Sequence, residues 1–216
     1  MERFIGYGSL VNESSARMTC PDLKNFSHYW MNGFRRVFGL VAFRTVTANP
    51  SLLEGREISA CYIYPDKEAC EDMLVCAFEV PDSDTPELRR REFEYYEQSV
   101  NLAPFYDDGE ETAGNVFIGY GREDLFVEAK GADATKINQP EYYAVYQGPY
   151  YRDDITPCRR YFRECLSAYK KLGDVVGVQN FINTSYLANG MSLRDFLRAQ
   201  NEAYLHEVGL TAKDIA

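Results

Sequence analysis

The chain has 216 residues, of which 45% are hydrophobic, and it includes 17 tyrosines and 13 phenylalanines. This length suits one sizeable domain, or one domain with an appendage, and the composition is unlike that of a disordered chain. The formal net charge of -10 argues against a nucleic-acid-binding surface, because such a surface depends on Lys and Arg that displace counterions from phosphates.

The N-terminal part of the chain is predicted to form short strands. Asn12 is placed to cap a short helix that ends near Cys20. Runs of aromatic and β-branched residues bounded by Gly and Pro indicate strands elsewhere. These strands are predicted over residues 3–7, 26–47 (with bends at the glycines), 58–64, 73–80 and 115–120.

Helical patterns dominate the rest of the chain. Helices are predicted over Thr85–Gln98, Ile155–Leu172 and Ser192–Val208, and a loop over residues 131–140. Many strands followed by late helices indicate the α+β class with a helical C-terminal appendage. We expect one domain over residues 1–150 and a helical extension over 151–216 that packs on it.

The letters FIGYG occur twice, at 4–8 and at 117–121. The similarity stops after five residues, so it does not predict a structural repeat. Ser9, Leu10 and a helix follow the first copy, and its backbone amides could bind a carboxylate there. A simple glycine turn after an edge strand is the alternative interpretation. Arg122 and Glu123 follow the second copy, which we interpret as a strand end before a solvated loop.

Glu92 occupies an unexpected position in the segment LRRREFEYYE. On a helical wheel it falls in the same arc as Phe93, Tyr95 and Tyr96, whereas Glu94 falls outside that arc. An inward-facing carboxyl would have a raised pKa, which suits a general acid and base. Alternatively, Glu92 pairs with Arg35, Arg36 or Arg89 and only stabilises the fold.

Together, these motifs resemble the γ-glutamylcyclotransferase superfamily over roughly residues 1 to 150. The turn of that family matches Tyr7, Gly8, Ser9 and Leu10, and its LDxxE or RExxxY segment matches Leu88, Arg91, Glu92 and Tyr96. GFRRVF at residues 33–38 is similar to a further family segment. The chain departs from the family at Arg89, where many members have Asp, and after Glu92, where glycines are missing.

The resemblance implies a small mixed β-barrel or sheet with flanking helices and an enzyme that releases 5-oxoproline from a γ-glutamyl compound. Glu92 would be the catalytic acid and base, and Tyr7, Gly8, Ser9 and Leu10 would bind the substrate. Tyr96 would hydrogen-bond Glu92 or the substrate, unless it only fills the core. The reaction needs no metal or other cofactor, because the substrate supplies its own nucleophile.

The expected partner is therefore a small γ-glutamyl molecule, with glutathione and γ-glutamyl amino acids ahead of γ-glutamyl amines. A non-catalytic member that binds an acidic metabolite or a protein, and a lyase or amidotransferase that uses the same Glu, remain alternatives. The sequence shows no signal peptide or membrane span, which predicts a cytoplasmic protein without a membrane partner. Its six scattered cysteines indicate reduced thiols, and its two histidines do not suggest a zinc site. The oligomeric state stays open.

Overall fold

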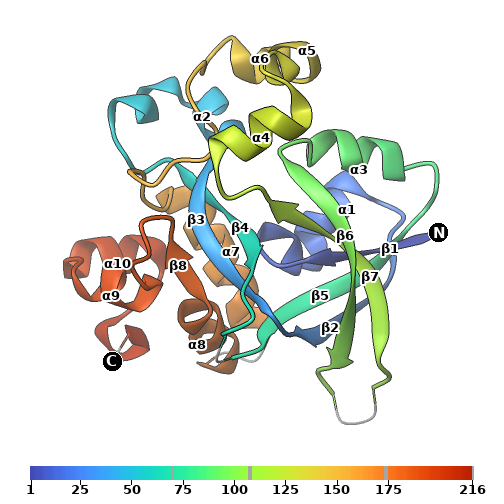
Figure 1. Ribbon diagram of the computed structural model, residues 1–216. Coiled ribbons are helices and arrows are strands. Elements are labelled where there is room, and N and C mark those ends of the chain that lie inside the picture. The colour runs from blue at the N-terminus through green and yellow to red at the C-terminus, as the bar shows by residue number, and fades with distance from the viewer. Residues whose placement is uncertain (70, 107–108, 173–174, 216) are drawn as a thin grey trace.

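The computed structural model describes residues 1–69, 71–106, 109–172 and 175–215 (Figure 1). Strands and helices both contribute to the fold, so the α+β class is confirmed. In the described part of the chain the strands are β1 (Glu2–Gly6), β2 (Lys24–Met31), β3 (Phe34–Val41), β4 (Ser59–Pro65), β5 (Met73–Val80), β6 (Tyr95–Pro104), β7 (Thr112–Gly119) and β8 (Ser185–Leu187).

The strands form two sheets. In the first, the strands pair in the order β1-β5-β2-β6-β7, and β7 returns to pair with β1 so that the order closes on itself. The β1–β7 pairing is parallel, and the other pairings in this sheet are antiparallel. The second sheet has the order β4-β3-β8. The two sheets bury apolar faces that line adjoining cores.

Helices cover the sheets at two places. In Figure 1, α2, α4, α5 and α6 gather at one end of the molecule, whereas α8, α9 and α10 lie beside β8. The α-helices are α1 (Glu13–Thr19), α2 (Phe43–Ala48), α3 (Thr85–Arg91), α4 (Glu123–Lys130), α5 (Ala134–Asn138), α6 (Pro140–Tyr143), α7 (Arg159–Lys171), α8 (Val175–Asn183), α9 (Leu193–Arg198) and α10 (Glu202–Val208). None of the helices in the described residues has the length and apolar character that crossing a bilayer requires.

Several local predictions agree with the structure. Asn12 caps α1, because its side chain accepts a hydrogen bond of 3.1 Å from the amide of Ser14. β5 covers residues 73–80 as predicted, and it is buried along almost its whole length because it pairs on both edges and faces both sides of the core. These are the positions where capping chemistry and apolar patterning act locally.

The predicted helix over Thr85–Gln98 is wrong beyond Arg91. Helix α3 ends there, residues 92–94 form a turn, and β6 starts at Tyr95. β6 pairs with β7 from Tyr95 opposite Gly119 to Leu102 opposite Thr112. This long ladder of hydrogen bonds outweighs the helical spacing of the side chains, which was the only signal for a continued helix.

Three other predictions need correction. The strand expected up to residue 47 gives way to α2, whose first residue, Phe43, packs on tyrosines that come much later in the chain. The loop expected over residues 131–140 contains α5, and the loop expected after Gly121 is replaced by α4. For α2, these contacts with distant tyrosines stabilise a short helix that the local pattern does not reveal.

The C-terminal segment is more than a helical addition. β8 pairs in parallel with β3, and α7 packs in the same apolar core as β1 and β5. The helix predicted over 192–208 is divided into α9 and α10, with Asn201 capping the second of them. A domain boundary at residue 150 stays a prediction. Helix α7, which follows that position, contributes to the same apolar core as β1.

Candidate functional site

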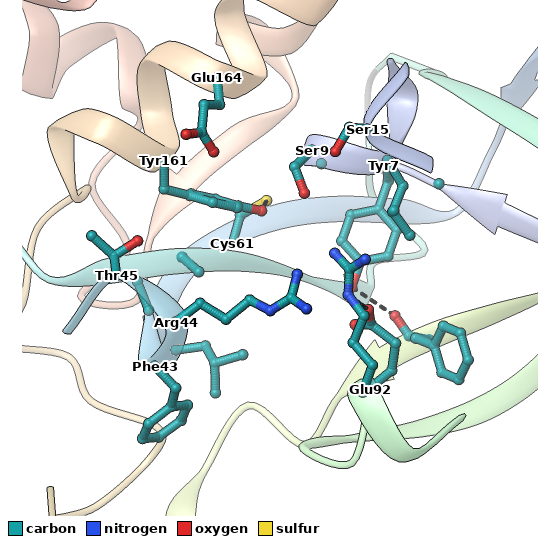
Figure 2. Close-up of a pocket in the computed structure, with 18 of the residues that line it drawn as sticks. Tyr7, Ser9, Ser15, Phe43, Arg44, Thr45, Cys61, Glu92, Tyr161 and Glu164 are labelled. Carbon is teal, nitrogen blue, oxygen red and sulfur yellow. Dashed lines mark hydrogen bonds and ion pairs between the residues drawn. The ribbon is translucent and has the colours of Figure 1, made fainter. Parts of the chain in front are cut away.

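A cavity of about 620 Å³ lies at the end of β1 (Figure 2). Its wall includes the turn at residues 7–10, the start of α2, the turn between α3 and β6, and one face of α7. The cavity brings together Ser9 and Glu92, which lie about eighty residues apart in the sequence. The two main motifs of the sequence therefore share one site.

The turn after β1 presents backbone donors to this cavity. The amides of Gly8 and Ser9 donate no hydrogen bond to any residue that the structure describes. A Cβ atom at Gly8 would lie 2.6 Å from the Tyr161 hydroxyl, so glycine permits the close approach of α7 to the turn. The turn can therefore offer N–H groups to an anion in the cavity.

A buried arginine fixes the turn from behind. Arg36 on β3 is 0% exposed, and its Nε donates a hydrogen bond of 2.8 Å to the Tyr7 carbonyl. The hydroxyl of Tyr169 donates to the same carbonyl over 3.0 Å. The guanidinium also lies over the rings of Tyr169 and Phe181, at 4.8 Å and 5.1 Å from their centroids. Carbonyl dipoles and π-faces thus stabilise the buried charge.

Glu92 follows the last residue of α3 and faces the cavity. Its side chain is 15% exposed and forms an ion pair of 2.9 Å with Arg91. Burial raises the pKa of Glu92, while the positive charges of Arg91 and Arg44 act in the opposite direction. A carboxyl with a raised pKa and a nearby cation can both accept and return a proton.

The predicted ion-pair partners of Glu92 are wrong. Arg35 lies 3.7 Å from Asp66, and Arg89 pairs with Glu2 and Glu97 on the surface. Arg36 hydrogen-bonds backbone carbonyls instead of a carboxylate. The partner is the adjacent residue Arg91, because the chain turns directly after α3 and leaves the two side chains next to each other.

A second carboxyl, Glu94, lines the same cavity. It is 5% exposed, and burial together with the charge of Glu92 raises its pKa to about 8. Glu94 is therefore mostly protonated at neutral pH, whereas the pKa of Glu92 is also pulled down by Arg91. Two carboxyls whose surroundings differ in this way can hold different protonation states.

Sequence reasoning missed Glu94, Arg44 and Tyr161. The helical wheel put Glu94 on the solvent side, but the turn at residues 92–94 reverses that orientation. Arg44 belongs to a helix that was predicted as a strand. No local signal in the sequence marks any of these three residues.

Tyr96 is separate from the cavity. It was expected one helical turn after Glu92, but it lies on β6, where its ring packs 5.4 Å from that of Tyr120. It does not line the cavity, so a hydrogen bond to Glu92 is not part of this site. The prediction fails for the same reason as the predicted helix, which ends at Arg91.

Cys61 is the cysteine that lines the cavity, and its sulfur lies 3.3 Å from the Tyr161 hydroxyl. Neither histidine lines the cavity, so a Cys/His pair is not formed there. The five cysteines that the structure describes are free thiols, and Cys70 lies outside the described residues. Among the described residues, no cluster of three or more His, Cys, Asp or Glu side chains could hold a metal ion.

Several solved structures are similar to this chain. One is described as a γ-glutamyl cyclotransferase, is 12% identical with a TM-score of 0.43, and matches over 72% of this chain and 88% of its own. Another is a γ-glutamyl cyclotransferase from yeast that is described as specific to glutathione; it is 14% identical with a TM-score of 0.46, over 85% of this chain and 95% of its own. A protein from Arabidopsis thaliana is 17% identical with a TM-score of 0.41, and it matches over 68% of this chain and 94% of its own.

No protein-family model and no curated protein matches the chain.

Proposed function

We propose that this protein is a γ-glutamylcyclotransferase-type enzyme that releases 5-oxoproline from a γ-glutamyl compound, with Glu92 as general acid and base. One observation carries the proposal. Glu92, whose pKa is raised by burial, faces the same cavity as the backbone amides of Gly8 and Ser9. These two amides donate no hydrogen bond to any described residue. A proton acceptor and a set of anion-binding donors are the two elements that this intramolecular reaction requires.

The reaction begins with proton transfer to Glu92. The carboxylate takes a proton from the α-ammonium group of the substrate, and the freed amine attacks the γ-carbonyl carbon of the same molecule. A tetrahedral intermediate forms with a negative charge on the former carbonyl oxygen. The amides of Gly8 and Ser9 donate hydrogen bonds to this oxyanion or to the α-carboxylate.

The second half of the reaction reverses the role of Glu92. The bond between the γ-carbon and the leaving nitrogen breaks as protonated Glu92 returns its proton to that nitrogen. The ring nitrogen, which carries two hydrogens after the attack, loses one of them, and the released amine takes up this proton to become an ammonium group. The products are cyclic 5-oxoproline and a free amine or amino acid, and Glu92 is again a carboxylate. No water is consumed, because the substrate amine replaces the leaving amine at the carbonyl.

The pH dependence follows from the environment of Glu92. Its carboxylate form is needed to start the reaction, and burial raises its pKa. The value of kcat/KM should therefore fall as the pH drops through a pKa above the usual value of about 4.3 for Glu. A pH profile of kcat/KM measures this directly, and an acid limb at or below the usual value would contradict the proposed role.

The decisive experiment measures 5-oxoproline release from glutathione and from a panel of γ-glutamyl amino acids and amines. Glu92→Gln keeps the shape of the side chain but cannot accept the proton, and we expect its kcat to fall about 100- to 10,000-fold. Glu128→Gln is a matched control, because Glu128 is exposed and does not line the cavity. Unchanged turnover in Glu92→Gln would overturn the mechanism.

The alternative is a protein of the same fold that binds a small acidic metabolite without turning it over. The arginines on the cavity wall also suit such a ligand. Binding of γ-glutamyl compounds without any release of 5-oxoproline would favour this alternative.

A further inference from the structure

Four arginines line the cavity in a chain whose formal net charge is -10: Arg44, Arg91, Arg160 and Arg163. Two of them have carboxylate partners, since Arg91 pairs with Glu92 over 2.9 Å and Arg160 pairs with Glu164 over 3.2 Å. Arg44 and Arg163 form no hydrogen bond or ion pair with any residue that the structure describes. The cavity therefore contains positive charge that the protein itself does not compensate.

Arg44 is held in position by its neighbour in α2. Phe43 is buried, and its ring packs on three tyrosine rings at centroid distances of 5.6, 6.0 and 4.0 Å, those of Tyr142, Tyr146 and Tyr150. This packing fixes the start of the helix, so the backbone of Arg44 has a defined place on the cavity wall. Figure 2 shows its side chain extending from α2 across the cavity toward Glu92.

The charge of Arg44 reaches the proposed reaction centre. It lowers the pKa of both Glu92 and Glu94, in opposition to the effect of burial. Arg163 lines the cavity from α7. Of the two arginines without a partner, Arg44 is therefore the one that lies close to where the substrate would react.

Arg44 is not needed to neutralise Glu92. Arg91 already forms the ion pair with that carboxylate, and the two side chains are only 14% and 15% exposed. The guanidinium of Arg44 thus keeps its full set of donors for a ligand. Its planar fork of N–H groups matches the two oxygens of a carboxylate.

We propose that Arg44 determines substrate specificity by binding a carboxylate on the leaving group. The inference rests on the proposed function and refines it. In the proposed reaction, the amides of the turn at Gly8 and Ser9 serve the glutamyl end. Arg44 projects from a different wall and would take the second carboxylate. γ-Glutamyl amino acids and peptides carry that second carboxylate, whereas γ-glutamyl amines lack it.

A matched pair of substrates tests the inference. γ-Glutamylglycine and γ-glutamylmethylamide have the same scissile bond and differ by the carboxylate on the leaving group. We expect the protein to prefer γ-glutamylglycine. In Arg44→Gln, kcat/KM for γ-glutamylglycine should fall roughly 10- to 100-fold, the effect of losing hydrogen bonds to a charged group. Because losing Arg44 also raises the pKa of Glu92, both substrates are compared on the pH-independent plateau above the acid limb of each variant. There the value for γ-glutamylmethylamide should change by less than about 3-fold.

Two variants serve as controls. Arg163→Gln removes the other unpartnered arginine and should leave the ratio of the two kcat/KM values within about 3-fold of the original. Arg44→Lys keeps the charge but loses the planar fork, and it should restore part of the preference for γ-glutamylglycine. If Arg44→Gln leaves the ratio of the two kcat/KM values unchanged, because both fall equally or neither falls, the inference is overturned while the proposed reaction stays intact.

The proposed function and this inference can fail separately. If the protein turns over neither compound, the proposed function fails, and calorimetric titration of the same two compounds then measures recognition alone. Binding of γ-glutamylglycine that weakens in Arg44→Gln, with binding of γ-glutamylmethylamide unchanged, would still support the role of Arg44. Binding that does not depend on Arg44, or no binding of either compound, would refute it.

Discussion

The two FIGYG segments have the same sequence and lie next to each other, yet only one forms a turn at the cavity. They belong to β1 and β7, which pair in parallel with Phe4 opposite Asn115. The rings of Phe4 and Phe117 stack at a centroid distance of 5.7 Å. The repeated letters thus form adjacent strands of one sheet, although the sequence similarity does not extend to a larger repeat.

The segments differ in what surrounds their tyrosines. Tyr7 is buried, and its hydroxyl donates a hydrogen bond of 2.7 Å to the carbonyl of Phe117 in the other segment. Tyr120 is only half-buried and packs against the rings of Tyr96 and Phe126. The second copy is therefore more than an ordinary strand end, because its backbone supports the tyrosine of the first copy and Phe117 lines the cavity.

The segments also differ in the environment of an arginine beside each of them. Behind the first, Arg36 is fully buried and binds the Tyr7 carbonyl. After the second, Arg122 is exposed and pairs with Asp124 two residues later. Identical local sequences thus acquire different roles from residues that lie elsewhere in the chain, and the following predictions test whether those neighbours account for the difference.

The largest difference in stability should be the one between variants of Arg36 and Arg122. Arg36→Met leaves carbonyls in the core with fewer donors, and we expect it to lower the free energy of unfolding by roughly 3 kcal/mol or more. Arg122→Gln removes only a surface ion pair and should change it by about 0.5 kcal/mol or less. Urea unfolding measures both.

The milder variant Arg36→Lys extends this test in case Arg36→Met does not fold. A lysine keeps the charge but cannot reach several acceptors with a planar fork, so it should also destabilise the protein. Similar stabilities for the Arg36 and Arg122 variants would mean that Arg36 does not distinguish the two segments.

The sequence predicted those parts of the fold that depend on local patterns. Alternating and continuous apolar runs identified β5, and a side-chain cap identified the start of α1. The boundary between α3 and β6 could not be predicted in this way. The pairing of β6 with β7, not the spacing within LRRREFEYYE, decides where the helix ends.

The sequence motifs placed Glu92 and the turn at residues 7–10 in one site, and both line one cavity, but the reason given for Glu92 was partly wrong. Glu92 does face the cavity, but it does so from a turn after α3 and not from the face of a helix. The same turn buries Glu94, which the helical wheel excluded, and moves Tyr96 away. Residues that approach from α2 and α7, such as Arg44 and Tyr161, reach the site through long-range packing that no local pattern records.

A smaller effect is expected from removing the two tyrosine hydroxyls. Tyr7→Phe leaves the buried carbonyl of Phe117 without this donor and should lower the free energy of unfolding by about 1 to 3 kcal/mol. Tyr120→Phe should change it by about 0.5 kcal/mol or less, because the hydroxyl of Tyr120 donates to no residue that the structure describes. Thermal and urea unfolding of both variants, measured side by side, test the difference; equal destabilisation would contradict it.

The smallest difference in stability should be the one between the last glycines of the two segments, and here activity should separate them. Gly121 has a φ of 74°, so Gly121→Ala should cost about 1 to 2 kcal/mol of stability without changing kcat/KM. Gly8→Ala should affect stability less than activity, because the new Cβ would lie 2.6 Å from the Tyr161 hydroxyl and displace the turn that faces Glu92. Assays of 5-oxoproline release combined with urea unfolding distinguish the two outcomes. A loss of activity in Gly121→Ala as large as that in Gly8→Ala would show that the two turns are functionally equivalent, and the distinct role assigned to the first turn would be wrong.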